Sequence, residues 1–520
     1  MHRLQRRRTA AALADRGPAS CRPHLAQGRG RLRGRHALAR QETRTMTAVT
    51  PVTSADPLVY LTVSEASRLI AARKLSPVEL VEAYLARVDA IDDVVHSYIA
   101  VLADRARAAA RIAEAEILAG RWKGPLHGIP FAVKDNYHVK GVKTTGGSRL
   151  MLDYVADETS TAIEKLEAAG AILLGKLNTW EYGTGTGEIY HDLPFPLARN
   201  PWNPARHTGG SSTGAGVAVA AGTAMFALGS DTGGSVRLPA AATGVYGMKA
   251  TYGLMSRAGC LPNCWSLDVV GPLTWTAEDN ATVAQVMAGY DPRDPQSADV
   301  PSYDLMAGFD MGLKGLTIGV VRDLGADAPS MDPDIVTKLA ETEALLTDLG
   351  ATVVEIALPA PLSKYRSVTG TINWAESLSI HEQDFMERSH LMGKALKDKM
   401  TAGFTVRAVD YVAATRYRRQ LAVTTDAVIR TVDAVLAPCT FITAPTFEDQ
   451  ERLVKFTFGS ATSIFNVTGH PAISIPTGFD RDGMPTSAQI VGRYFDEATT
   501  YRVARALEKA AGTRGLRPAL

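Results

Sequence analysis

Short apolar runs alternate with helical stretches through the first half of this 520-residue chain, and this alternation constrains the fold most. The apolar runs are "GIPFAVKD", "AILLGK" and "AMFALGSD", which begin at residues 128, 171 and 224. The stretches between them, "TSTAIEKLEAAG" and "STGAGVAVAAG", have helical composition. Apolar runs of this length are typical of buried strands, and their alternation with helices predicts an α/β fold built in layers.

The pattern continues towards the C-terminus. The strand-like runs at 315–323 and 351–358 flank an expected helix at 332–349, and 360–430 is mainly helical. An earlier helix is clearly signalled at Ser76, an N-cap followed by Pro77 and by Glu79 of a capping box. No Pro/Ser-rich linker interrupts the chain after residue 57. We therefore expect one large α/β/α domain over 57–513, around a mixed and mostly buried sheet.

Residues 1–45 differ from the rest in composition. They hold twelve arginines and two acidic residues, and no apolar core of a secretory signal. We expect a disordered extension or an upstream start, with Met46 as the native first residue. The remaining chain has 44 basic and 52 acidic residues, a net charge of −8. This balance argues against a nucleic-acid partner.

Cysteine usage and hydropathy exclude other classes. Four cysteines in 520 residues do not make a disulfide framework. Cys260 and Cys264 lack the second pair that a zinc site needs, so we expect no metal and no cofactor. No apolar run of 18 residues occurs without charges or Gly/Pro breaks. We expect a cytoplasmic protein without a membrane partner, and the oligomeric state stays open, with a homodimer as one option.

Two Gly-Ser clusters, at 209–212 and 233–235, allow three interpretations: a linker, a phosphate loop or a catalytic centre. A linker would be polar, but the residues between these clusters are apolar. A phosphate loop needs Lys followed by Ser or Thr, and neither cluster has it. The nearest match, at 170–177, ends in Leu177 and has strand composition. The nucleophile elbow Gly-x-Ser-x-Gly is absent from both clusters.

The catalytic interpretation agrees with the chemistry. Ser235 follows a strand and a turn of small residues, where backbone N–H groups can stabilise an oxyanion. Gly233 and Gly234 have no Cβ to block a substrate carbonyl. A serine nucleophile needs a base, and no histidine lies in this stretch. Lys134 ends an apolar run, where burial would lower its pKa towards neutrality and allow it to act as a base.

These motifs together resemble the amidase signature family. The match includes "GPLHGIPFAVKDN", "GAILLGKLNTWEYGTGTGE", "RNPWNPARHTGGSS", "GSDTGGSVRLPAA" and "FNVTGHPAISIPTGF", in the family's order from about residue 60. The chain departs from the family pattern at Thr213, Ala215 and Ala250, outside the residues that carry the chemistry.

The resemblance implies a Ser–cis-Ser–Lys triad. Ser235 would be the nucleophile, Ser211 the bridging serine on a cis Gly210–Ser211 peptide, and Lys134 the base. The oxyanion hole would be formed by the N–H groups of Thr232, Gly233, Gly234 and Ser235. Supporting roles would fall to Gly210, Ser212, Asp231 and Arg237, and the acyl pocket to Tyr182, Gly183 and Thr184. We also expect Asp135 to brace the site rather than contact Lys134, because a nearby carboxylate would raise the lysine pKa.

The substrate is less constrained. The family includes the glutaminase subunit of tRNA-dependent amidotransferases, in which an Asp before the "N-x-x-G-x-P" strand entry holds the ammonium group of glutamine. No acidic residue occurs from Val454 to Phe465 in this chain. We therefore expect a hydrolase of the C–N bond of a small-molecule amide, anilide or carbamate (urethane). The alternatives are the glutaminase subunit of a tRNA-dependent amidotransferase and a carbamate or ester hydrolase. The variable stretch from about 275 to 460 should form the pocket, with Trp374, Phe385, Met386, Met392, Phe404, Tyr411, Phe456 and Phe458 as core or pocket residues.

Overall fold

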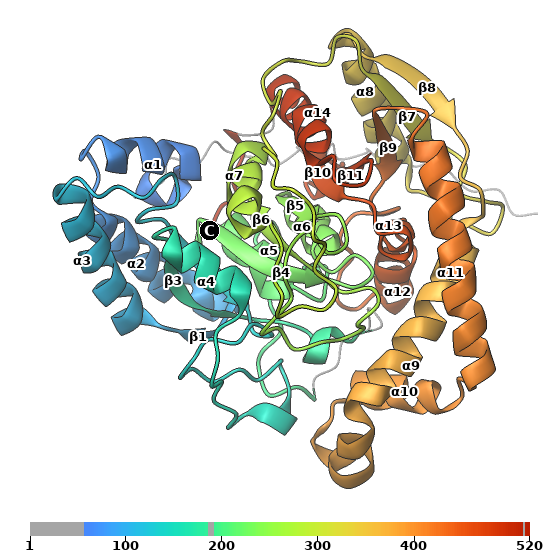
Figure 1. Cartoon of the computed structure of the whole chain (residues 1–520), viewed down its shortest axis with the longest axis horizontal. Coiled ribbons are helices and arrows are strands. Elements are labelled where there is room, and N and C mark those ends of the chain that lie inside the picture. Colours follow the sequence, from blue (N-terminus) through green and yellow to red (C-terminus); the bar gives the residue numbers. More distant parts are fainter. Residues whose placement is uncertain (1–56, 186–191, 513–514) are drawn as a thin grey trace, which may run out of the picture. The chain divides into compact units, whose positions relative to one another are not determined.

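An eleven-stranded mixed sheet crosses the chain in the computed structural model, which describes residues 57–185, 192–512 and 515–520 (Figure 1). Its strand order is β1-β3-β2-β4-β6-β5-β10-β11-β9-β7-β8. The strands are β1 Tyr98–Val101, β2 Pro130–Lys134, β3 Ile172–Leu177, β4 Phe226–Asp231, β5 Tyr246–Lys249, β6 Val269–Thr274, β7 Thr317–Val321, β8 Thr352–Ile356, β9 Ala434–Pro438, β10 Ala472–Phe479 and β11 Pro485–Gly492.

Helices alternate with these strands along the sequence. They are α1 Val63–Ala71, α2 Pro77–Val95, α3 Ala103–Leu118, α4 Thr161–Ala168, α5 Thr213–Ala221, α6 Arg237–Thr243, α7 Ala277–Met287, α8 Pro333–Asp348, α9 Leu362–Arg388, α10 Lys394–Phe404, α11 Ala408–Ile429, α12 Gln450–Phe458, α13 Ser463–Thr468 and α14 Glu497–Ala511. The expected strands at 130, 172 and 226 and the unit β7–α8–β8 are all present. The capping box at Ser76 is also confirmed, with its hydroxyl accepting hydrogen bonds from the N–H groups of Val78 and Glu79.

The sheet is covered on both faces. Every residue of β2, β3, β9 and β11 is buried, and successive strand residues point to opposite faces. Helices α5 and α6 contact each other and the central strands, while α7 and α14 contact each other and β5, β6, β10 and β11. These observations confirm the expected α/β fold around a mixed, buried sheet.

Strand pairing brings two chemically important strand ends to one edge. β2 is parallel to both β3 and β4, with Val133 paired to Leu228. Lys134 ends β2 and Asp231 ends β4, so both residues lie at the carboxyl edge of these strands. The carboxyl ends of parallel strands are where ligands bind in open α/β sheets.

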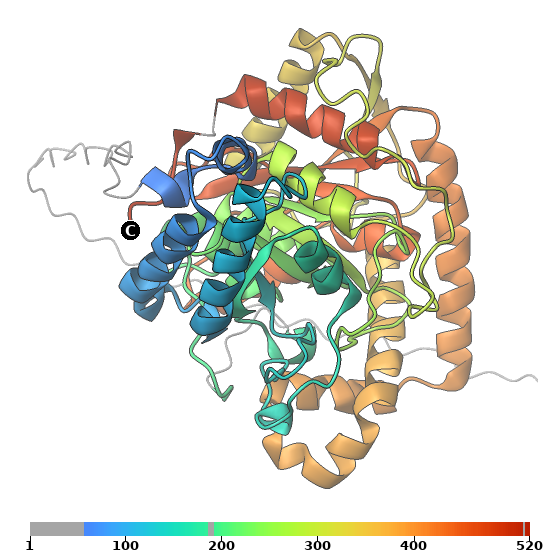
Figure 2. The ribbon, with the colours of Figure 1, turned by 60° about the vertical axis from the view of Figure 1, so that its left-hand side comes forward.

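Three consecutive helices form a separate group beside the sheet. Figures 1 and 2 both show α9, α10 and α11 together, and α9 contacts α10, α11 and α13. This arrangement confirms the mainly helical stretch expected from 360 to 430.

The expected N-terminal extension, 1–45, lies outside the described residues. The residues described from 57 onward belong to one compact unit, Val49–Leu520. In the described part of the chain, no helix is both long and apolar enough to cross a membrane.

Candidate active site

Lys134 is fully buried at the end of β2 and bonds to two serine hydroxyls. Its side-chain nitrogen lies 2.7 Å from Ser211 Oγ and 2.9 Å from Ser230 Oγ. Asn136 Nδ2 also donates to Ser230 Oγ, at 3.1 Å. The strand end and the first Gly-Ser cluster therefore meet, although 77 residues separate Lys134 from Ser211.

Burial sets the charge of Lys134. Loss of solvent lowers its pKa from the usual 10.5 to about 7, and the more distant carboxylates of Asp268 and Asp231 oppose that shift only in part. Asp135 pairs with the equally buried Lys176, with 2.7 Å between the ammonium and carboxylate atoms. Lys134 can therefore be neutral near neutral pH, as a base requires.

Ser211 is held by its backbone. The Gly210–Ser211 peptide bond is cis. The Ser211 carbonyl accepts hydrogen bonds from Trp180 N–H at 3.1 Å and from Thr179 Oγ1 at 3.2 Å. A Cβ built on Gly183 would come within 3.3 Å of Ser211 Oγ, so Gly183 lies against the hydroxyl.

Ser235 is half-buried and borders the main cavity. Its carbonyl accepts a hydrogen bond from Ser212 N–H at 3.3 Å, which joins the two Gly-Ser clusters. Between the described side chains of Ser235 and Ser211 no hydrogen bond is formed. Catalytic hydrogen bonds are often long before substrate binds, so the geometry is compatible with a relay that closes on binding.

Ser212 connects the first cluster to β4. Its hydroxyl accepts from Ser230 N–H and donates to the Ser230 carbonyl, both at 3.3 Å. Its side chain makes no capping bond to α5. The hydrogen-bonding role expected for Ser212 thus fits the geometry better than helix capping.

The oxyanion turn differs from expectation at Gly234. The N–H group of Gly234 donates to Asp231 Oδ1 at 2.7 Å and is not available to a substrate. Within the described residues, the N–H groups of Thr232, Gly233 and Ser235 have no protein acceptor, and these three residues border the cavity. The structure therefore leaves three of the four expected donors.

Asp231 and Arg237 brace this turn from below. Arg237 is fully buried and bonds to Asp231, Gln489 and Asn466. Asp231 also accepts from the N–H groups of Val236 and Arg237, at the start of α6. Burial alone would raise the pKa of Asp231, but Arg237 and Asn466 lower it to about 2. Neither Asp231 nor Arg237 borders the cavity, as expected for supporting residues.

A cavity of about 740 Å³ opens in front of Ser235. The segment that we expected to form its wall does so, through Thr457, Phe458, Ser460 and Ser463. Trp374 and Phe458 are the only two of the eight large side chains singled out above that line it. Of the expected acyl pocket, Gly183 lines the cavity; Tyr182 packs on His381 instead, with ring centroids 4.4 Å apart, and Thr184 lies outside. The complete lining of described residues is Trp180, Gly183, Gly185, Gly210, Thr232, Gly233, Ser235, Leu238, Asn263, Ser363, Arg366, Ser367, Thr369, Gly370, Thr371, Asn373, Trp374, Thr457, Phe458, Ser460 and Ser463.

Sequence reasoning missed a second lysine near the turn. Lys399 of α10 donates to Asn263 Oδ1 at 2.5 Å, and Asn263 Nδ2 donates to Thr232 Oγ1 at 3.1 Å. Thr232 Oγ1 in turn donates to Asp268 Oδ1 at 2.6 Å. No motif marks Lys399, because α10 carries several lysines and only the packing shows which one faces inward.

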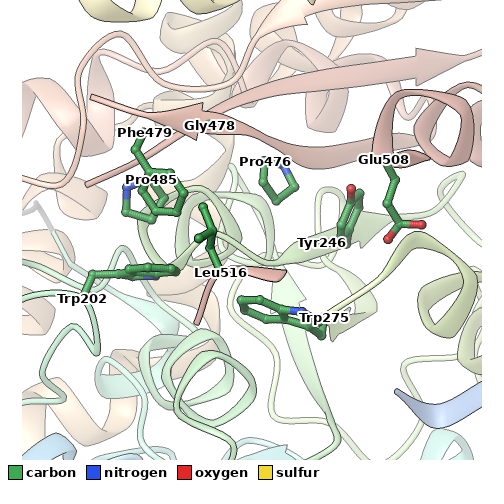
Figure 3. Close-up of a pocket in the computed structure, with 10 residues that line it drawn as sticks. Trp202, Tyr246, Trp275, Pro476, Gly478, Phe479, Pro485, Glu508 and Leu516 are labelled. Atoms are coloured by element: carbon green, nitrogen blue, oxygen red, sulfur yellow. The ribbon is translucent and has the colours of Figure 1, made fainter. Parts of the chain in front are cut away.

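Another crevice lies away from the triad (Figure 3). Aromatic side chains, among them Trp202 and Trp275, surround Leu516 there. Its volume of about 20 Å³ is close to that of one water-sized probe, and its lining has no nucleophile. We assign no chemistry to it. Among the residues with described placement, no group of three His, Cys, Asp or Glu side chains is arranged to hold a metal.

A family model described as Amidase matches residues 79–501. The matching subunit of the glutamyl-tRNA(Gln) amidotransferase of Chloroflexus aurantiacus is 36% identical over 493 residues, which are 89% of this chain and 99% of that protein. Among solved structures, the peptide amidase of Stenotrophomonas maltophilia has 29% identity and a TM-score of 0.76, and the match covers 89% of this chain and 99% of that one.

Two further solved structures agree. A bacterial aryl acylamidase has 25% identity and a TM-score of 0.79 over 89% of this chain and all of that chain. The corresponding subunit of the glutamyl-tRNA(Gln) amidotransferase of Thermotoga maritima has 30% identity and a TM-score of 0.74 over 89% of this chain and 98% of that one. Together with the eleven-stranded sheet, these matches show that the chain belongs to the amidase signature family of amide-hydrolysing enzymes.

Proposed function

We propose that this enzyme hydrolyses the C–N bond of an amide through an acyl-enzyme on Ser235. The observation that carries the proposal is the 2.7 Å contact between buried Lys134 and Ser211, beside a serine that borders a large cavity. A base of pKa about 7 next to a hydroxyl relay is what an unactivated serine needs.

The steps follow from this geometry. Neutral Lys134 accepts the Ser211 proton, Ser211 accepts the Ser235 proton, and Ser235 Oγ attacks the carbonyl carbon. The N–H groups of Thr232, Gly233 and Ser235 stabilise the oxyanion. The proton returns through Ser211 to the leaving nitrogen, the C–N bond breaks and the amine departs. Water then gives its proton to the same relay and attacks the ester, which releases the acid and restores the Ser235 hydroxyl.

The names of the sequence relatives favour a second candidate. The relatives reported above are named as subunits of glutamyl-tRNA(Gln) amidotransferases, and the match spans nearly their full length at 36% identity. In this candidate the chain would hydrolyse glutamine and pass on ammonia within a larger assembly that serves a tRNA. That function opposes our expectation of a small-molecule enzyme without a nucleic-acid partner.

The cavity favours a substrate without an ammonium group. Its described lining contains no Asp or Glu side chain, and Arg366 is its only charged residue. An ammonium group taken out of water needs a carboxylate partner to offset desolvation. On this geometry we rank a stand-alone hydrolase of linear amides above a glutaminase, and anilides and carbamates present the same carbonyl to Ser235.

Labelling of Ser235 by a fluorophosphonate tests the nucleophile. The wild-type protein should be labelled and should hydrolyse amides, whereas Ser235→Ala should lose both properties. Ser379→Ala, which removes an exposed hydroxyl from α9, is the matched control and should keep both. Full turnover by Ser235→Ala would exclude the proposed mechanism.

A substrate panel separates the two candidates. It contains an aliphatic amide, an anilide, a nitrophenyl carbamate, an ester and glutamine, each compared by kcat/KM. The geometry predicts that at least one substrate without an ammonium group exceeds glutamine. Hydrolysis of glutamine alone would establish the amidotransferase candidate instead.

A further inference from the structure

One charged side chain in the wall of the cavity has no counter-ion. Arg366, on α9, is partly buried and borders the cavity. Its Nη2 donates to the Ser460 carbonyl at 3.3 Å, and its buried Nε has no hydrogen-bond partner among the described residues. None of the carboxylates with described placement forms an ion pair with it, and Asp327 acts on it only from beyond that range. Arginines taken partly out of water are usually paired, so this one is unusual.

The guanidinium keeps its charge. Burial lowers the pKa of Arg366 to about 10, which leaves it protonated at neutral pH. Most cavity residues around it on α9 and in 457–463 carry neutral hydroxyl or amide groups. A planar guanidinium with free donors matches a carboxylate, which it can bind through two parallel hydrogen bonds.

Contacts place Arg366 close to the reacting centre. Thr369, one helical turn further along α9, is the nearest side chain to a Cβ built on Gly233 of the oxyanion turn, at 3.9 Å. From the other side, Ser460 Oγ lies 2.9 Å from Thr462 Oγ1, which donates to the Gly233 carbonyl at 2.6 Å. One turn of helix is about 5.4 Å, a length that two or three methylene groups span.

We propose that Arg366 binds a carboxylate on the substrate, two or three carbon atoms from the scissile carbonyl. This inference rests on the proposed function and names its substrate class: half-amides of dicarboxylic acids and related anionic amides. Glutaramate has this carboxylate and lacks the ammonium group of glutamine, while valeramide has the same chain length and no charge. The cavity should therefore prefer glutaramate to both compounds.

Release of ammonia measures this preference. The wild-type ratio of kcat/KM for glutaramate over valeramide should exceed about 10, because a hydrogen-bonded charge pair contributes that factor or more. Arg366→Gln should bring the ratio close to 1, and Arg366→Lys should keep part of it. Arg419→Gln removes the same charge from an exposed position on α11 and should leave the ratio unchanged. A ratio cancels any general loss of active protein.

Binding to the Ser235→Ala protein gives a readout that needs no turnover. Calorimetry should show tighter binding of glutaramate than of valeramide, and the difference should vanish in Ser235→Ala/Arg366→Gln. Equal binding of the two compounds, or a preference that survives Arg366→Gln, would overturn the assignment of Arg366. Retained hydrolysis by Ser235→Ala would instead overturn the proposed function, so the two failures are distinct.

Discussion

Asp135 follows Lys134 in the chain, yet its carboxylate pairs with Lys176 at 2.7 Å. Lys134 ends β2, and neighbouring residues of a strand point to opposite sides. The carboxylate that is nearest in sequence is thereby kept from Lys134 and neutralised by another buried lysine. This pairing accounts for a lysine that burial can bring to a pKa of about 7.

The first prediction concerns the pH dependence of catalysis. Protonated Lys134 cannot accept a proton, so kcat/KM for a neutral amide should rise with pH through about 7 and level off above it. Lys134→Arg stays charged and should lose at least about 100-fold in kcat, the usual contribution of a general base. Rates between pH 5 and 9 test this, and a flat profile would contradict it.

The second prediction concerns the buried pair of Asp135 and Lys176. Lys176→Met leaves an unpaired buried carboxylate and should lower the free energy of unfolding by about 3–5 kcal/mol. Removing the partner charge as well, in Asp135→Leu/Lys176→Met, should recover part of the loss. Lys394→Met removes a lysine from an exposed pair with Asp398 and should change stability by less than about 1 kcal/mol. Urea unfolding measures all three, and equal losses for the two lysine variants would refute the idea.

The third prediction compares two neighbouring glycines. Gly234 has φ +134°, and a Cβ there would lie 2.3 Å from Thr462 Oγ1. A Cβ on Gly233 meets only Thr369, at 3.9 Å. Gly234→Ala should therefore displace the oxyanion turn and reduce kcat by roughly 100-fold or more, while Gly233→Ala should fold with little backbone change. Crystal structures of both variants, together with their kcat values, decide whether the glycines differ in this way.

The fourth prediction concerns stability in acid. The folded-state pKa of Asp231 is about 2, below the value of about 3.9 in an unfolded chain. Its contribution to stability is complete above the unfolded value and is lost as the pH falls towards 2. The difference in unfolding free energy between wild type and Asp231→Asn should thus shrink from pH 5 to pH 2. Asp153→Asn, at an exposed carboxylate, is the control and should show a small difference throughout. A gap for Asp231→Asn that widens in acid would show that the sign is wrong.

The alternation of strands and helices and the Gly-Ser motifs were sufficient to predict the fold and the cluster around Lys134. Periodicity locates a buried strand because every residue of β2 and β4 lies in the core or at the site. The motifs also indicated that Ser211 and Ser235 belong to one site. The hydrogen bond from Ser212 N–H to the Ser235 carbonyl joins the two turns that carry them.

The cavity wall could not be predicted in the same way. Helix α9 packs on α10, α11 and α13, so its apolar pattern does not show which polar side chains face the cavity. Arg366 was therefore missed, although its helix was expected. The loss of Gly234 as an oxyanion donor was missed for a related reason, since it depends on where the Asp231 side chain turns.

The cavity lining comes from two separate parts of the sequence. The residues around the relay all precede residue 264, while the opposite wall begins at Ser363 in α9 and ends at Ser463. Mutations in the later stretch can change which molecule enters without altering Lys134, Ser211 or Ser235. Selectivity in this lineage is thus free to diverge by local sequence change while the bond-breaking apparatus is inherited intact.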